Sequence, residues 1–115
     1  MLPKENRLKK RSAFAATYRT GKSFHVGGIT VFIGKEKNND IPTKFGFVVS
    51  KKIHKRAVKR NRIKRLMRES CRISIKDNAF NNKYLSLVFV ASSKILDKDF
   101  MYVNSTINKL LEKLW

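Results

Sequence analysis

Residues 45–74 read FGFVVSKKIHKRAVKRNRIKRLMRESCRIS, and this stretch decides the fold. It opens with aromatic and β-branched residues, which favour a strand over residues 45–50. From residue 55 onward it contains neither Gly nor Pro, and its apolar residues recur at helical spacing. The stretch therefore predicts a strand that leads directly into a long helix over residues 55–74.

The predicted helix has two chemically different faces. At 100° per residue, one face collects Ile63, Leu66, Met67, Ser70 and Ser74, with Ile73 at its margin. The opposite face collects Ala57, Arg60, Asn61, Lys64, Arg68 and Arg72, with Arg65 beside them. We expect the first face to pack on a sheet. Glu69 is the only acid in the helix, and we expect it to pair with Arg65.

The cationic face is more than an ordinary solvated helix face. Solvated faces usually alternate the sign of their charges, whereas Arg60/Lys64, Lys64/Arg68 and Arg68/Arg72 are successive like-charge pairs that destabilise a free helix. Residues 51–72 hold 11 of the 27 Lys and Arg residues and one acid. The first of these cations lie where the strand meets the helix N-terminus, whose N–H groups already favour phosphate. The pattern indicates an anionic partner.

The amino-acid composition of the chain restricts which kinds of anionic partner it can bind. The chain of 115 residues carries a net charge of +19 and is 42% hydrophobic, which predicts one folded domain over residues 1–115 that binds a polyanion. Nucleic acid is the leading partner and an anionic membrane surface the alternative. The longest largely apolar run, residues 84–91, is too short to span a bilayer. With no apolar N-terminal signal and a single cysteine, Cys71, the sequence predicts a cytoplasmic protein without membrane association.

The remaining segments predict an α+β domain. Ser12 is expected to cap a short helix that places Phe14 and Tyr18 on one face and closes at Gly21. Strands are expected over residues 29–33 and 45–50, joined as a hairpin by the turn-rich residues 37–42, and a buried strand over residues 84–91. Asp97 is expected to cap a last helix. Its apolar stripe consists of Phe100, Val103, Ile107, Leu110, Leu111 and Leu114.

The aromatic residues leave two interpretations open. We assign Phe45, Phe47, Phe89 and Phe100 to the core, because the sheet and the last helix need large apolar residues. For any one of Phe14, Tyr18 and Phe32, a place in the core is the more common outcome. As a set beside a cationic helix, however, the three rings could stack unpaired bases.

The sequence contains no pattern typical of a catalytic or metal site. His25 and His54 have no Cys or acid at metal-ligand spacing, and the acids form no pair suited to acid–base or two-metal chemistry. A Gly-rich phosphate loop and a nucleophile motif are also absent. We therefore expect no catalytic residues and no metal or cofactor bound by the protein itself.

Two motifs resemble a known family, the protein subunit of bacterial ribonuclease P. Residues 46–52, GFVVSKK, are similar to the signature strand of that family, and residues 57–69, AVKRNRIKRLMRE, to its arginine-asparagine-arginine helix. Arg7, Leu8, Phe14, Tyr18 and Gly21 match its N-terminal pattern. The glycine that many members place after the paired lysines is replaced here by residues 53–56, IHKR, and Val48 stands where some relatives have a small polar residue.

The resemblance implies an α-β sandwich with a mixed four-stranded sheet and a left-handed βαβ crossover, a fold shared with a domain of a small-subunit ribosomal protein. It also implies an accessory subunit of an endoribonuclease that matures the 5′ end of tRNA. The partner RNA and its Mg²⁺ ions would carry the chemistry. The protein, a monomer, would bind that catalytic RNA and the single-stranded 5′ leader of precursor tRNA.

The resemblance also implies roles for individual residues. By position, the leader-binding residues would be Phe14, Tyr18, Phe32, Lys51, Asn61, Lys64 and Arg68. The residues facing the catalytic RNA would be Lys52, Lys59, Arg60, Arg62 and Arg65.

Two alternatives share the cationic face. A ribosomal or assembly protein would bind RNA without any dependence on a leader. A DNA-binding module would use residues 57–72 as a recognition helix, although the sequence lacks the preceding helix and turn of that motif.

Overall fold

The computed structural model describes residues 2–37, 40–77 and 83–114. In chain order the elements are η1 (Lys4–Asn6), α1 (Arg11–Arg19), β1 (Ser23–Val26), β2 (Ile29–Ile33), β3 (Lys44–Val49), α2 (Ala57–Lys76), β4 (Ser86–Ala91), η2 (Ser93–Ile95) and α3 (Phe100–Glu112). The predicted α+β class is confirmed. Within the described residues, no helix combines the length and the hydrophobicity needed to cross a membrane.

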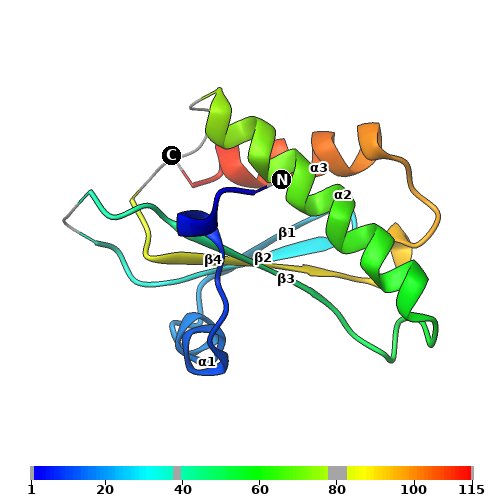
Figure 1. Cartoon of the computed structure of the whole chain (residues 1–115), viewed down its shortest axis with the longest axis horizontal. Coiled ribbons are helices and arrows are strands. Elements are labelled where there is room, and N and C mark those ends of the chain that lie inside the picture. Colours follow the sequence, from blue (N-terminus) through cyan, green and yellow to red (C-terminus); the bar gives the residue numbers. More distant parts are fainter. Residues whose placement is uncertain (1, 38–39, 78–82, 115) are drawn as a thin grey trace.

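The four strands form one mixed sheet in the order β1-β2-β4-β3. β2 is antiparallel to both β1 and β4, whereas β3 and β4 are parallel. Helices α2 and α3 cover one face of the sheet and α1 lies against the other (Figure 1). The chain leaves β3, crosses the sheet as α2 and returns as β4 in a left-handed turn, which confirms the expected exception to the usual handedness.

The predicted hairpin between residues 29–33 and 45–50 is wrong. Strand β4 lies between β2 and β3 and pairs with both. β2 instead forms its hairpin with β1, which the sequence analysis missed. Gly27 and Gly28 make the two-residue turn with φ angles of +54° and +95°, a conformation that glycine adopts without the steric cost of a Cβ atom.

The core lies between the sheet and helices α2 and α3. Alternate strand residues face the helices, as the buried Ile29, Val31 and Ile33 of β2 show. From α2 the core receives Ile63, Met67 and Cys71, and from α3 Val103, Ile107, Leu110 and Leu111, with Leu114 just beyond. Both predicted apolar helix faces are therefore confirmed, although Leu66, Ile73 and Phe100 are only half-buried.

Two predicted helix caps are each wrong by two residues. Helix α1 begins at Arg11 with Lys10 at its N-cap, so Ser12 lies inside the first turn. The Lys10 carbonyl accepts hydrogen bonds from the amides of residues 13 and 14, at 3.0 and 3.2 Å. Helix α3 is capped by Asp99, not Asp97, because the Asp99 carboxylate accepts a 3.0 Å hydrogen bond from the Tyr102 amide. Gly21 follows α1 with a φ of +72°, as expected.

Candidate nucleic-acid interface

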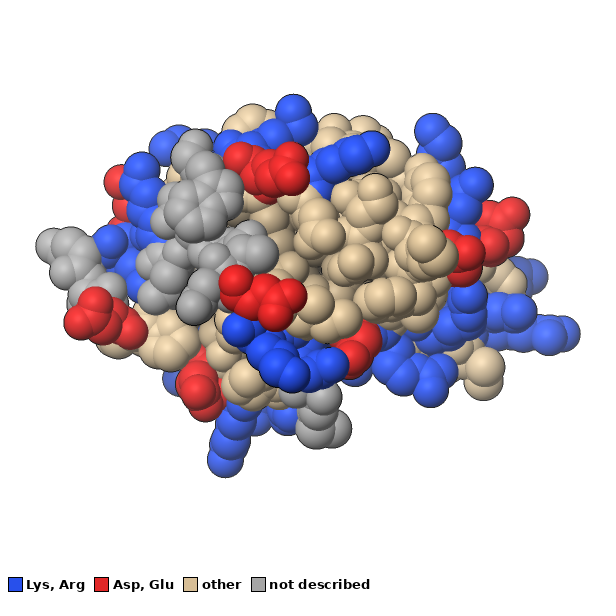
Figure 2. Space-filling model, turned by 90° about the horizontal axis from the view of Figure 1, so that it is seen from above, with Lys and Arg blue, Asp and Glu red and all other residues tan. Residues whose placement is uncertain are grey.

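Helix α2 carries most of its charge away from the core. In the view onto α2 and α3, Lys and Arg side chains lie mainly at the margins and gather at the end where Figure 1 places the start of α2 (Figure 2). The middle of this face is largely uncharged. Among the predicted site residues, those exposed at this end are Lys51, Lys52, Lys59, Asn61 and Arg65.

Two of the predicted RNA-binding arginines also bind the polypeptide itself. The Arg60 guanidinium donates hydrogen bonds of 2.8 Å to the carbonyl oxygens of His54 and Lys55. Arg62 donates a 3.1 Å hydrogen bond to the carbonyl oxygen of Lys98, ahead of α3. Arg60 thus holds the loop before α2, while Arg62 ties α2 to the segment that leads into α3.

Side chains within the loop before α2 also hold its shape. The Ser50 hydroxyl accepts a 3.1 Å hydrogen bond from the Lys52 amide, and the His54 ring nitrogen Nδ1 accepts one of 3.0 Å from the Arg56 amide. The loop before α2, which contains no glycine, is therefore ordered by local acceptors and by Arg60. These bonds fix the backbone positions from which Lys51 and Lys52 extend.

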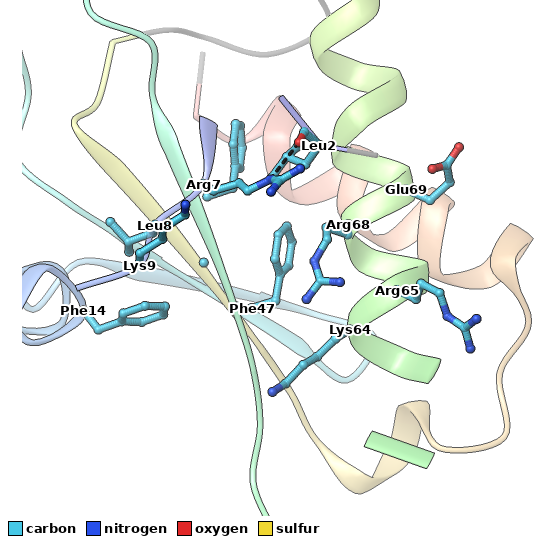
Figure 3. A pocket seen from close by; sticks show the side chains of 12 residues that line it. Leu2, Arg7, Leu8, Lys9, Phe14, Phe47, Lys64, Arg65, Arg68 and Glu69 are labelled. Atoms are coloured by element: carbon cyan, nitrogen blue, oxygen red, sulfur yellow. Dashed lines mark hydrogen bonds between the residues drawn. The ribbon is translucent and has the colours of Figure 1, made fainter. Parts of the chain in front are cut away.

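A pocket of about 570 Å³ opens beside the edge strand β3, between α2 and the N-terminal segment. Lys64 and Arg68 point from α2 toward Phe47 in the middle of the pocket, whereas Arg65 and Glu69 point away from it (Figure 3). On the other side lie Phe14, from α1, and the segment that includes Arg7, Leu8 and Lys9. The pocket thus gathers Phe14, Lys64 and Arg68 from the seven predicted leader-binding residues.

Gly46 allows the ring of Phe14 to lie directly on β3. A Cβ atom at position 46 would lie 2.5 Å from Phe14 Cε1 and 2.7 Å from Cζ, closer than non-bonded carbon atoms approach. The glycine of the GFVVSKK motif is therefore required by the aromatic ring packed on it. This contact positions Phe14 in the lining of the pocket.

Tyr18 and Phe32 meet each other on the α1 side of the sheet. Their ring centroids are 4.9 Å apart in an edge-to-face arrangement, and Phe32 is half-buried while 38% of Tyr18 is exposed. Partial burial raises the pKa of the Tyr18 hydroxyl above its ordinary value, so this group remains a hydrogen-bond donor at neutral pH. The two rings form a partly open apolar surface rather than a part of the core.

Phe47 does not occupy the core position that the sequence analysis assigned to it. Phe45 and Phe89 are buried as predicted, but Phe47 is half-buried and lines the pocket. Its ring stacks on Phe89 with centroids 5.9 Å apart, and the Arg68 guanidinium carbon lies 6.0 Å from its centroid. The assignment failed because β3 is an edge strand, so its outer flank has no neighbouring strand.

The N-terminal segment covers only the first part of the β3 edge. Arg7 forms a parallel bridge with Phe45, and the Leu8 amide donates a 2.9 Å hydrogen bond to the Phe45 carbonyl oxygen. The Arg7 side chain donates to the Leu2 carbonyl at 2.9 Å. Lys9 lines the pocket although it was not predicted to do so; the run of cations at residues 9–11 was a usable signal for it.

The predicted pair between Arg65 and Glu69 is replaced by one between Arg72 and Glu69. The Glu69 carboxylate accepts hydrogen bonds from Nη2 of Arg72 at 2.6 Å and from Nε at 3.1 Å. This hydrogen bonding lowers the pKa of the Glu69 carboxyl group. Arg72 is thereby paired on the helix surface, whereas Lys64 and Arg68 point toward the pocket.

Comparison with known proteins identifies close sequence relatives. A family model described as Ribonuclease P matches residues 2–115. The ribonuclease P protein component of Clostridium botulinum (strain Langeland) is 36% identical over 110 residues, which cover 96% of this chain and 95% of that protein. The protein component from Clostridium novyi is 34% identical over 112 residues, covering 97% and 96% of the two chains.

Solved structures agree with this fold. The RNase P protein of Staphylococcus aureus superposes with a TM-score of 0.79 at 26% identity, covering 96% of each chain. The RNase P protein of Thermotoga maritima superposes with a TM-score of 0.77 at 24% identity, covering 93% of this chain and 96% of the other. At that identity the second likeness supports the fold alone.

Proposed function

Because this chain belongs to the ribonuclease P protein family, we propose that it binds the catalytic RNA of that enzyme together with the 5′ leader of precursor tRNA. A ribonuclease P protein component is part of an endoribonuclease that processes tRNA. We assign the catalytic RNA and the 5′ leader to different parts of one cationic surface of this chain.

The observation that carries the leader assignment is the pocket beside β3. Lys64 and Arg68 point into it from one side, and the Phe14 ring lies at the other. Cations spaced along a groove neutralise successive phosphates, and aromatic rings stack on unpaired bases. The open rings of Tyr18 and Phe32 extend this surface across the α1 side of the sheet. A single strand fits such a surface better than a duplex, whose bases are already stacked.

The opposite side of α2 is proposed to bind the catalytic RNA. Arg65 points away from the pocket in Figure 3, and Lys52 and Lys59 are exposed. Arg60 and Arg62 also belong to this group, and their bonds to main-chain carbonyls hold the surface in place. Lys51 and Asn61, exposed near the start of α2, are proposed to contact the leader beyond the pocket.

The proposed division leaves the chemistry to the RNA. Among the described residues, no three His, Cys, Asp or Glu side chains gather in a way that could hold a metal ion. We assign the Mg²⁺ that activates the attacking water to the RNA partner, as the family resemblance implies. The protein would contribute by neutralising phosphates and by holding the leader as a single strand beside the cleavage site.

The deciding experiment measures cleavage of precursor tRNA by the catalytic RNA at limiting Mg²⁺, with and without this protein. We expect cleavage to increase when the protein is present, and the protein alone to cleave nothing. An unchanged rate would refute the proposed role. Affinity for precursor tRNA should also exceed that for mature tRNA, whereas equal affinities would refute the leader assignment and favour a general RNA-binding protein.

A further inference from the structure

Phe47 presents a half-buried aromatic ring and an outward-facing strand edge inside the same pocket. We propose that one unstacked nucleobase of the bound leader stacks on Phe47, with its polar edge against the main chain of β3. The inference rests on the proposed function, because it requires the leader to pass through this pocket. It gives a recognition role to a side chain that the sequence assigns to the core.

The ring of Phe47 is the least buried of three nearly parallel rings. The buried ring of Phe89, on the neighbouring strand, stacks with those of Phe45 and Phe47, with centroids 6.3 and 5.9 Å away and interplanar angles of 15°. Phe47 is half-buried, and its ring points into the pocket. A planar base in the pocket could stack on the exposed part of the Phe47 ring without disturbing the two buried rings.

The strand edge beside this ring can form hydrogen bonds with a base. In a strand, alternate residues direct their N–H and C=O groups to opposite sides. The Lys44 amide bonds to Leu85 on the β4 side, whereas the Phe45 carbonyl accepts from Leu8 on the outer side. Phe47 therefore directs its N–H and C=O groups outward too. The N-terminal segment does not follow β3 that far, because its bridge is at Phe45 and the chain enters α1 at Arg11.

The positive charges around the pocket favour the binding of an anionic ligand. Lys9, Lys64 and Arg68 line the pocket, and the Arg68 guanidinium lies over the same ring that would receive the base. A guanidinium plane stacks on bases as well as on phenyl rings, so Arg68 would move away from the Phe47 ring and cover the other face of the bound base. The volume of about 570 Å³ lies within the range of small-ligand sites and accommodates a nucleotide. A strand-forming apolar peptide would leave these cations without partners.

The test uses the complex of the protein with its catalytic RNA and precursor tRNA carrying 2-aminopurine at successive leader positions. In the wild-type complex we expect fluorescence quenching at one leader position, from stacking on Phe47. Phe47→Leu retains an apolar side chain against Phe89 but removes the ring. We expect it to abolish the quenching at that position and to weaken precursor binding about fivefold or more.

Phe24→Leu is the matched control, since Phe24 is 39% exposed on β1, the strand at the opposite edge of the sheet. It should change neither quenching nor affinity. Leader-dependent binding that survives in Phe47→Leu with full quenching would overturn the inference and leave the proposed function intact. Binding by the wild type that ignores the leader would refute the proposed function, and the inference with it.

If Phe47→Leu does not fold, an NMR titration of the wild type tests the inference instead. Titration of the full chain with a single-stranded leader oligonucleotide should shift the amide NMR signals of Gly46 and Phe47. If the signals of Tyr18 and Phe32 shift while those of residues 46 and 47 do not, the inference is wrong. Displacement of the oligonucleotide from residues 46 and 47 by an uncharged strand-forming peptide at lower concentration would also overturn it.

Discussion

The ring of Phe14 and the backbone of Gly46 touch so closely that a single added methyl group would force them apart. An alanine Cβ would lie 2.5 Å from the ring. Gly46→Ala should therefore displace Phe14, lower the stability by about 1–3 kcal/mol through overpacking, and weaken leader binding. Urea denaturation and precursor-tRNA titration measure the two effects.

The double variant Gly46→Ala/Phe14→Ala separates these effects. It removes the clash, so it should be more stable than the sum of the two single substitutions predicts. It should not recover leader binding, because the ring is absent. Additive losses of stability would mean that the two residues do not interact as described.

Arg62 and Arg68 lie on the same helix but should respond differently to truncation. Arg68→Ala removes a cation that points into the pocket, so it should weaken leader binding and reduce the salt slope by about 0.7 for each phosphate contact that is lost. Arg62→Ala removes the hydrogen bond to the Lys98 carbonyl and should lower the stability by about 1 kcal/mol, with a smaller effect on the leader. Leader binding measured between 50 and 200 mM salt, together with denaturation, distinguishes the effects of the two substitutions. If Arg62→Ala weakened leader binding more than Arg68→Ala, the proposed assignment of α2 residues to leader and catalytic RNA would be wrong.

Arg60→Lys keeps the positive charge but loses the planar guanidinium that reaches two carbonyl groups. The loop before α2 should then become more mobile, since the carbonyls of His54 and Lys55 lose their shared donor. We expect faster amide hydrogen exchange in residues 51–56 and weaker binding of the catalytic RNA. Lys59→Arg, at an exposed neighbouring position, should leave exchange unchanged. Unaltered exchange in Arg60→Lys would show that the loop does not depend on this residue.

Cys71 should make the stability depend on pH in the alkaline range. Complete burial raises the pKa of its thiol far above the ordinary value of about 8.5, so the folded state keeps the proton while the unfolded chain loses it. Below about pH 8.5 both states are protonated and the thiol adds no pH dependence. Above it the unfolding free energy of the wild type should fall, relative to Cys71→Ala, by about 1.4 kcal/mol per pH unit. Parallel stability curves for the two proteins between pH 7.5 and 10.5 would contradict this.

Local periodicity predicted the helices well, and the reason is physical. The apolar stripes of α2 and α3 repeat at helical spacing over several turns, so their buried faces follow from the sequence alone. Strand β1 was missed because its first three residues, Ser23, Phe24 and His25, are exposed and show no apolar alternation. The strand order was mispredicted because the strand between β2 and β3 is supplied by residues 86–91, far along the chain.

The cationic side of the site followed from charge spacing, but its aromatic side did not. Alternation along β3 places Phe45, Phe47 and Val49 on one face of the sheet, and it does not reveal which of them the helix leaves uncovered. That depends on the edge position of β3 and on the direction of α2. The choice between Arg65 and Arg72 as the partner of Glu69 likewise depends on side-chain directions that helical spacing permits equally.

The left-handed crossover has a consequence for how the protein folds. β3 and β4 are neighbours in the sheet, so their pairing closes a loop that contains the whole of α2, and repulsion among the cations of α2 adds to the barrier for this step. A polyanion that neutralises α2 would lower this barrier, so the rate at which β3 joins the sheet should rise with RNA concentration in refolding experiments.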